Sequence, residues 1–131
     1  MMRLLLAVVI AAGLAQAHHW YFQPMDGSAW DVRIRKDSLL AFSHKDTLVF
    51  RDGRLTVASA AKDGIAPAGY SARRAGKEPQ VWTARLDEAG ATARWEGTVR
   101  EDRIEGFVVR SRADGRETRY RFSGKRRSIP V

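Results

Sequence analysis

Apolar and polar residues alternate with a period of two along most of the chain from Ala29 onward. This period is typical of strands that bury one face, whereas no segment beyond residue 17 shows the 3.6-residue period of an amphipathic helix. The pattern predicts eight or nine short strands, at about 30–34, 38–43, 48–50, 55–57, 70–73, 81–86, 91–99, 103–111 and 117–123.

Short turn sequences separate these segments. Asp52-Gly53, between two alternating apolar segments, is a strong hairpin signal because both turn positions favour a positive φ. We read His44-Lys45-Asp46 as a turn as well, and residues 58–68 as a loop with one helical turn near Ser59 to Lys62. Strands joined by such tight turns are antiparallel.

The expected fold is all-β: a small antiparallel up-and-down β-barrel of about eight strands, with a β-sandwich as the alternative. A long meander closes or splits into two sheets, because open edges pair with other chains. Gly97 and Gly106 favour the barrel, since glycines at matching places on neighbouring strands allow the sheet to coil. A barrel of this size is either filled by side chains or holds one small ligand.

Structural glycines and aromatics also carry a resemblance to a known family. Over about residues 46–126 the chain resembles small exported bacterial barrels of lipocalin-like, or calycin, type. Lipocalins have an N-terminal Gly-x-Trp motif, with one residue between the glycine and the tryptophan. Here Gly27-Ser28-Ala29-Trp30 has two residues between them, so the motif is not matched. The resemblance implies a fold and a possible cavity, and no activity. The motifs are Trp95-x-Gly97-x-Val99, Asp102-x-Ile104-x-Gly106 and Tyr120-x-Phe122-x-Gly124.

The first seventeen residues differ from the rest. A basic start at Arg3, an apolar segment over 4–14 and the small-x-small sequence at 15–17 are typical of a secretory signal peptide, and the segment is too short for a membrane span. We therefore expect a periplasmic or secreted protein that begins at His18 and has no transmembrane segment. The expected parts are an N-terminal extension over 18–28, the barrel over 29–124 and a frayed basic tail over 125–131.

Charge and cysteine content narrow the classes of function. The chain has 23 Lys and Arg, 15 Asp and Glu, no Cys and a net charge of +8, or +7 without residues 1–17. The lack of cysteine excludes disulfides, thiolate metal sites, a cysteine nucleophile and a lipid anchor on cysteine. The positive charge favours anionic partners. Arginines interspersed with acids are also typical of an ordinary solvated surface, and this alternative stays open. An anionic envelope component is the candidate partner, and export argues against nucleic acid.

No motif for catalysis, a metal or a cofactor is assigned. Ser43 and His44 are adjacent, so a regular strand would point them to opposite faces. The glycine-flanked nucleophile elbow of serine hydrolases is absent, and most acidic residues fall in turns. The amine and imidazole of His18 would chelate copper(II) only with a further ligand from a distant segment. We therefore expect no enzyme.

Aromatic residues on the predicted strands offer the best hypothesis. In so small a barrel some must point inward, where they fill the core or line a cavity. Arg110 shares a face with Val108, and on an internal face it would meet a carboxylate or phosphate head. The candidate ligand-binding residues are Tyr70, Trp82, Trp95, Phe107, Arg110 and Tyr120.

Two functions from different classes follow. The first is a binding module for a small amphipathic or anionic ligand. The alternative is a solid-core interaction protein that acts on an envelope component through its basic surface. A continuous cavity lined by Tyr70 and Trp82 would favour the first, whereas a filled interior with arginines gathered on one outer face would favour the second.

Overall fold

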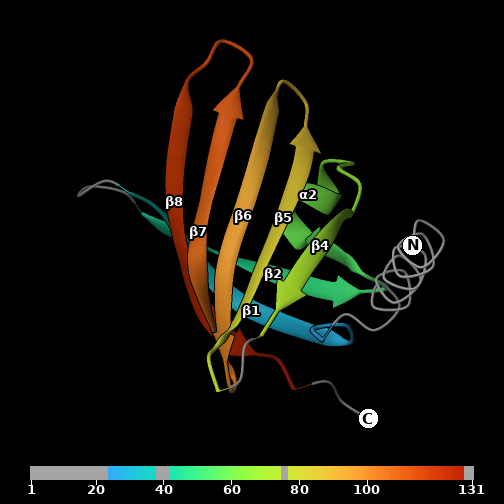
Figure 1. Cartoon of the computed structure of the whole chain (residues 1–131). Helices are drawn as coiled ribbons and strands as arrows, with labels where there is room; N and C mark the ends of the chain where they lie inside the picture. Colours follow the sequence, from blue (N-terminus) through green and yellow to red (C-terminus); the bar gives the residue numbers. More distant parts are fainter. Residues whose placement is uncertain (1–23, 38–41, 75–76, 129–131) are drawn as a thin grey trace, which may run out of the picture.

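A computed structural model describes residues 24–37, 42–74 and 77–128. Its strands form a closed antiparallel barrel in which each pairs with its neighbours in sequence and β1 also pairs with β8, so the expected barrel is confirmed (Figure 1). The elements are β1 (Ser28–Lys36), β2 (Ser43–Arg51), β3 (Arg54–Val57), α2 (Ala58–Lys62), β4 (Ala68–Arg73), β5 (Gln80–Glu88), β6 (Ala91–Arg100), β7 (Arg103–Arg112) and β8 (Glu117–Arg126). The expected signal peptide over 1–17 and His18 lie outside the described residues.

The beginning of β2 corrects one expectation. The expected strand at 38–43 lies mostly outside the described residues, and the expected turn at His44-Lys45-Asp46 is wrong, because these residues belong to a continuous β2. His44 pairs with Ile34 and Asp46 with Val32 of β1. The pairing satisfies the backbone of this polar segment, so it extends as a strand although its side chains resemble those of a turn.

Two of the local predictions between strands are confirmed. Asp52 and Gly53 have φ values of 53° and 72°, as the expected hairpin between β2 and β3 requires. The helical turn expected near Ser59 to Lys62 is α2. Gly97 and Gly106 are direct partners on β6 and β7.

The ordered domain extends beyond the expected limits of 29–124 at both ends. Met25 is buried, and the Asp26 carboxylate accepts hydrogen bonds from the Gly53 amide (3.0 Å) and the Tyr70 hydroxyl (2.6 Å). At the other end β8 continues to Arg126, which pairs with Trp30. The expected frayed tail is therefore wrong for residues 125–126, because β1 provides a partner for their backbone.

Glycines allow the strands to approach closely where the sheet coils. A Cβ placed on Gly106 would lie 2.0 Å from the Glu96 carbonyl oxygen, and one on Gly124 would lie 2.0 Å from the Asp31 carbonyl oxygen. Such distances are far inside van der Waals contact, so no larger residue fits without moving the backbone. In Figure 1 the strands β5 to β8 stand upright side by side, and β1 and β2 cross them at a steep angle.

The barrel has two unlike ends. At the end where Asp52 and Gly53 turn the chain, large inward side chains pack tightly, and we call this the filled end. The Phe50 ring lies 4.9 Å from the Tyr70 ring and 5.0 Å from the Trp82 ring, both edge to face. Phe50 and Trp82 are both 0% exposed. The fully buried side chains of this end are Trp30, Leu48, Phe50, Leu55, Tyr70 and Trp82.

Candidate functional site

The opposite end of the barrel encloses a cavity of about 200 Å³, which we call the mouth cavity. It lies between α2 and the ends of β5 to β8 that meet in the β5–β6 and β7–β8 turns. These two turns are at the top of Figure 1. Its inner wall is apolar and its outer wall is polar. The apolar residues are Ile34, Val57, Ala60, Leu86, Ala93, Trp95 and Val108, and the polar ones are His44, Asp46, Ser59, Asp63, Glu88, Arg110 and Tyr120.

Arg110 and Glu88 form the most buried ion pair among the described residues. Arg110 Nε and Nη2 donate to the two oxygens of Glu88 at 2.9 and 3.3 Å, and the side chains are 39% and 14% exposed. The guanidinium carbon also lies 5.4 Å from the centre of the Tyr120 ring. The carboxylate and the ring hold Arg110 over the cavity, and Glu88 neutralises its charge.

Asp46 connects α2 to the barrel wall. Its Oδ1 accepts hydrogen bonds from the backbone amides of Thr47 (2.8 Å) and Ser59 (3.0 Å), and its Oδ2 accepts one from the Ser59 hydroxyl. The Ser59 amide belongs to the first turn of a helix and needs an acceptor from outside the helix. A carboxylate from β2 therefore caps α2 and fixes it at the cavity.

The structure divides the six predicted ligand-binding residues into three groups. Trp95, Arg110 and Tyr120 line the mouth cavity. Tyr70 and Trp82 point inward but belong to the filled end and do not line the mouth cavity, so the continuous cavity lined by both, which would have favoured a binding module, is not found. They pack against Phe50 instead, which leaves no space beside them.

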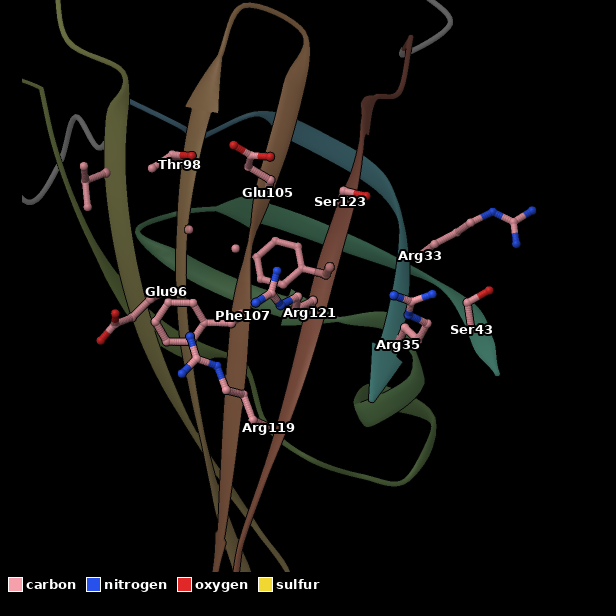
Figure 2. Close-up of a pocket in the computed structure, with 14 residues that line it drawn as sticks. Arg33, Arg35, Ser43, Glu96, Thr98, Glu105, Phe107, Arg119, Arg121 and Ser123 are labelled. Atoms are coloured by element: carbon pink, nitrogen blue, oxygen red, sulfur yellow. The ribbon is translucent and has the colours of Figure 1, made fainter. Parts of the chain in front are cut away.

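Phe107 points away from the interior and does not line the mouth cavity. Its strand neighbours Gly106 and Val108 face inward, and alternation directs Phe107 to the outer surface. There the Arg119 guanidinium carbon lies 4.3 Å from the centre of its ring. Figure 2 shows this stacked pair in an open outer groove of about 740 Å³.

Sequence reasoning missed several residues of the mouth cavity. The predicted strand ends at residue 86, whereas β5 continues to Glu88, which faces Arg110. The turn expected at His44-Lys45-Asp46 gave His44 and Asp46 no place on a strand face, so neither was predicted to line a cavity. The alternation of His44 and Asp46 with the buried Leu48 and Phe50 was the available signal, because residues two apart share a face.

Outer surfaces carry most of the arginines. The groove in Figure 2 has Arg33 and Arg35 of β1 on one side with Arg119 and Arg121 of β8, and Glu96 and Glu105 on the other. Arg121 approaches Asp37 at 3.7 Å. Within the described part of the chain, Arg33 and Arg35 form no ion pair.

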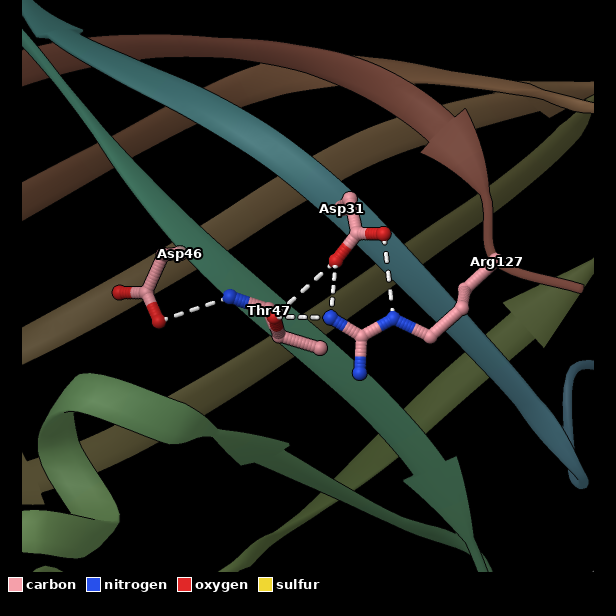
Figure 3. A network of polar contacts seen from close by, with 4 residues as sticks. All are labelled: Asp31, Asp46, Thr47 and Arg127. Carbon is pink, nitrogen blue, oxygen red and sulfur yellow. Dashed lines mark hydrogen bonds and ion pairs between the residues drawn. The ribbon is translucent and has the colours of Figure 1, made fainter. Parts of the chain in front are cut away.

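A second outer groove, of about 910 Å³, crosses the contact between β1 and β8. In it Arg127 Nη2 and Nε donate to the two oxygens of Asp31 at 2.6 and 3.1 Å, and Nη2 also donates to the Thr47 hydroxyl at 3.3 Å (Figure 3). The hydrogen bond from Arg127 lowers the pKa of Asp31. This network holds the end of β8 against β1 and β2.

Other polar groups in the core are explained by the fold. Burial, and then the Asp26 carboxylate, raise the pKa of Tyr70, so its hydroxyl stays protonated and donates to Asp26. The indole N–H groups of Trp82 and Trp95 are buried and have no acceptor among the described residues. Because Trp82 is in the filled end, such an unmet donor does not by itself mark the cavity.

Comparisons with known proteins do not assign the chain to a family. The chain matches no protein-family model, no curated protein and no solved structure. In the ranges that the structure describes, no three histidine, aspartate or glutamate side chains gather as a metal site requires. Over those same ranges, no helix has the length and apolar character needed to cross a membrane.

Proposed function

We propose that this protein is an exported binding module of lipocalin-like shape that holds a small amphipathic molecule in the mouth cavity. The observation that carries the proposal is the division of that cavity into an apolar inner wall and a polar rim. An apolar wall gains free energy from a hydrocarbon or ring, while a few polar groups orient the head. The signal-like residues 1–17 support the exported part of the proposal.

The Arg110–Glu88 pair defines the kind of head group. A guanidinium has five N–H donors, and the pair uses two of them. The others remain for ligand oxygens without breaking the ion pair. Because Glu88 balances the charge of Arg110, we expect a head rich in hydrogen-bond acceptors, neutral or carrying a single negative charge.

The size of the cavity limits the apolar part. About 200 Å³ is below the roughly 300–1,000 Å³ of pockets that enclose drug-sized ligands. The filled end prevents the cavity from deepening, because Trp82 and Phe50 occupy the axis below it. The ligand is therefore a short chain or a single ring, with its head at the rim.

The first experiment is native mass spectrometry of the protein purified gently from the periplasm of an expressing bacterium. We expect a bound small molecule that is lost on denaturation, and its mass identifies the ligand class. A mass equal to the bare chain in every preparation would count against a retained ligand.

A pair of helix variants tests the site itself. Ala60 is buried in α2 and lines the cavity, whereas Ala61 is exposed on the same helix. Ala60→Phe should fill the cavity and weaken binding of octanoate and of octyl glucoside about tenfold, the value of roughly two buried methylenes. Ala61→Phe is the matched control, and titration calorimetry measures both. Equal affinities in the two variants, with equal melting temperatures, would place binding elsewhere.

A further inference from the structure

An exposed aromatic residue stands at the mouth end of the barrel, just before β2. Phe42 is 94% exposed and directly precedes β2, whose first residue Ser43 pairs with Arg35. The other large exposed hydrophobic residue among those described, Val81, is only 38% exposed. A single exposed apolar residue is ordinary on a protein surface, so Phe42 points to a partner only together with the charges on the neighbouring strands.

The outer face of the sheet near the start of β2 carries cations placed opposite one another. On the outer face Arg33 pairs with Lys45 of β2, and Arg35 pairs with Arg121 of β8. Like charges directly opposite in a sheet repel. Arg85 and Arg94 are also opposite one another, but each has a carboxylate at 3.8 Å, whereas the described residues place none that close to Arg33, Arg35 or Lys45. Arg121 has the Asp37 carboxylate at 3.7 Å. Arg51 and Arg54, at the filled end, are a further opposite pair without a described carboxylate at that distance, so opposed cations alone do not mark a docking site. Only at the mouth end do they lie near an exposed aromatic residue, and there an anionic partner would relieve the repulsion.

From these two features we infer that the outer face of β1 and β8 docks on an anionic phospholipid surface. The docking surface comprises Phe42 and the cations Arg33, Arg35, Lys45 and Arg121. Its guanidinium and ammonium groups neutralise lipid phosphates, and the Phe42 ring enters the boundary between head groups and acyl chains. A polyanionic glycan would neutralise the same cations but would leave Phe42 in water.

The position of the docking surface connects it with the mouth cavity. His44 lines the cavity and lies two residues after Phe42 on the same chain segment. Docking through Phe42 therefore brings the mouth close to the lipid, which is itself a source of amphipathic molecules. The docking does not depend on the cavity, because the outer face of β1 and β8 is formed whether or not a ligand is bound.

Vesicle co-sedimentation of the protein purified from the periplasm, with its N-terminus sequenced, tests the docking. The probes are vesicles of phosphatidylethanolamine with phosphatidylglycerol, vesicles of phosphatidylcholine, and soluble heparin. We expect binding to the anionic vesicles and none to the phosphatidylcholine vesicles. The double variant R33E/R35E should lose about tenfold or more in vesicle affinity, since each basic group near an anionic surface contributes substantially.

The matched control is R51E/R54E. Arg51 and Arg54 are also exposed and directly opposite, but they lie at the filled end, away from Phe42. The net charge changes equally in both variants, so only position differs between them. The control should keep its vesicle affinity within about twofold, because Arg51 and Arg54 lie outside the docking surface. Equal losses in the two double variants would overturn the docking surface in favour of a general effect of charge.

Phe42→Ser separates lipid from glycan. We expect it to weaken binding to anionic vesicles severalfold and to leave heparin binding unchanged. Vesicle binding that is indifferent to Phe42, together with tight heparin binding, would overturn the lipid proposal and identify a polyanionic glycan. The octanoate affinity of R33E/R35E should equal that of the unmodified protein, so a failure of docking is distinguishable from a failure of ligand binding.

Discussion

The filled end and the mouth end belong to the same strands and follow the same inward alternation, yet one is solid and the other is hollow. At the filled end the inward positions of β2 and β5 carry Phe50 and Trp82. At the mouth end β6 and β7 carry Ala93 and Val108, followed at the rim by Arg110. The difference teaches that strand number sets only the diameter of a barrel. The inward side chains decide, level by level, whether it encloses space.

The largest expected effect comes from a glycine variant that separates β6 from β7, because these strands contribute to both ends of the barrel. Gly106→Val places a side chain against the backbone of the neighbouring strand, where a Cβ would already lie 2.0 Å from the Glu96 oxygen. We expect a loss of more than about 4 kcal/mol of folding free energy, and little folded protein. Gly97→Val should cost less, because its Cβ meets the Trp82 side chain at 2.8 Å and not backbone. Circular dichroism melting measures both.

Gly69→Ala is the control for these glycine variants. The nearest atom to a Cβ at Gly69 is the Gly53 oxygen at 4.0 Å, an ordinary contact. Its melting temperature should therefore change little. Equal melting of all three variants would show that close strand approach is not what bends this barrel.

A second prediction compares one tryptophan from each end. Trp82→Ala should cost about 3–5 kcal/mol, because it opens a void among rigid neighbours that cannot collapse. Trp95→Ala should cost less, because Trp95 already borders a cavity and the enlarged space can take up water. Urea denaturation of the two variants measures the difference. A larger loss for Trp95 would contradict the division into a solid and a hollow end.

The smallest expected effect is a dependence on alkaline pH at the filled end. The folded state raises the pKa of Tyr70 above its ordinary value of 10.0. The protonated Tyr70 hydroxyl therefore contributes its full share to the free energy of unfolding below pH 10, and this contribution declines as the pH rises beyond 10. Tyr70→Phe removes the hydrogen bond to Asp26, and should cost about 1–3 kcal/mol at neutral pH. The variant should also lose less stability on going from neutral to alkaline pH.

Tyr120→Phe at the mouth is the control for this titration. Its hydroxyl forms no hydrogen bond with any other described residue, and its ring remains beside Arg110. Denaturant midpoints across the alkaline range should follow those of the unmodified protein. If Tyr70→Phe and the unmodified protein lose stability in parallel, the buried hydroxyl is not the group that titrates.

Local signals in the sequence were sufficient for most of the fold. Asp52-Gly53 specified its hairpin because only a few residues accept two successive positive φ angles. The pairing of Gly97 with Gly106 could be anticipated because alternation set the register of β6 and β7. His44, Lys45 and Asp46 were misassigned because pairing with a distant strand, which no local pattern records, decided their conformation.

The candidate site was predicted less well, for a related reason. Alternation tells which residues share a face, but the choice between inside and outside needs the neighbouring strands. Phe107 has a large apolar ring and still lies on the outer surface, because its strand neighbours Gly106 and Val108 face the interior. Arg110 was expected to meet a carboxylate, and it does so, but the carboxylate is the chain's own Glu88.

The pairing of β1 with β8 has a consequence for how the chain folds. Arg127 and Asp31, which join these strands, are 96 positions apart. A contact of that sequence separation has a high loop-closure entropy, and proteins rich in such contacts fold slowly. While the chain is being synthesised, β1 has only β2 beside it until β8 has emerged. We therefore expect the edge of β1 to stay open to aggregation until β8 pairs with it, and the ion pair of Arg127 with Asp31 to form only at that step.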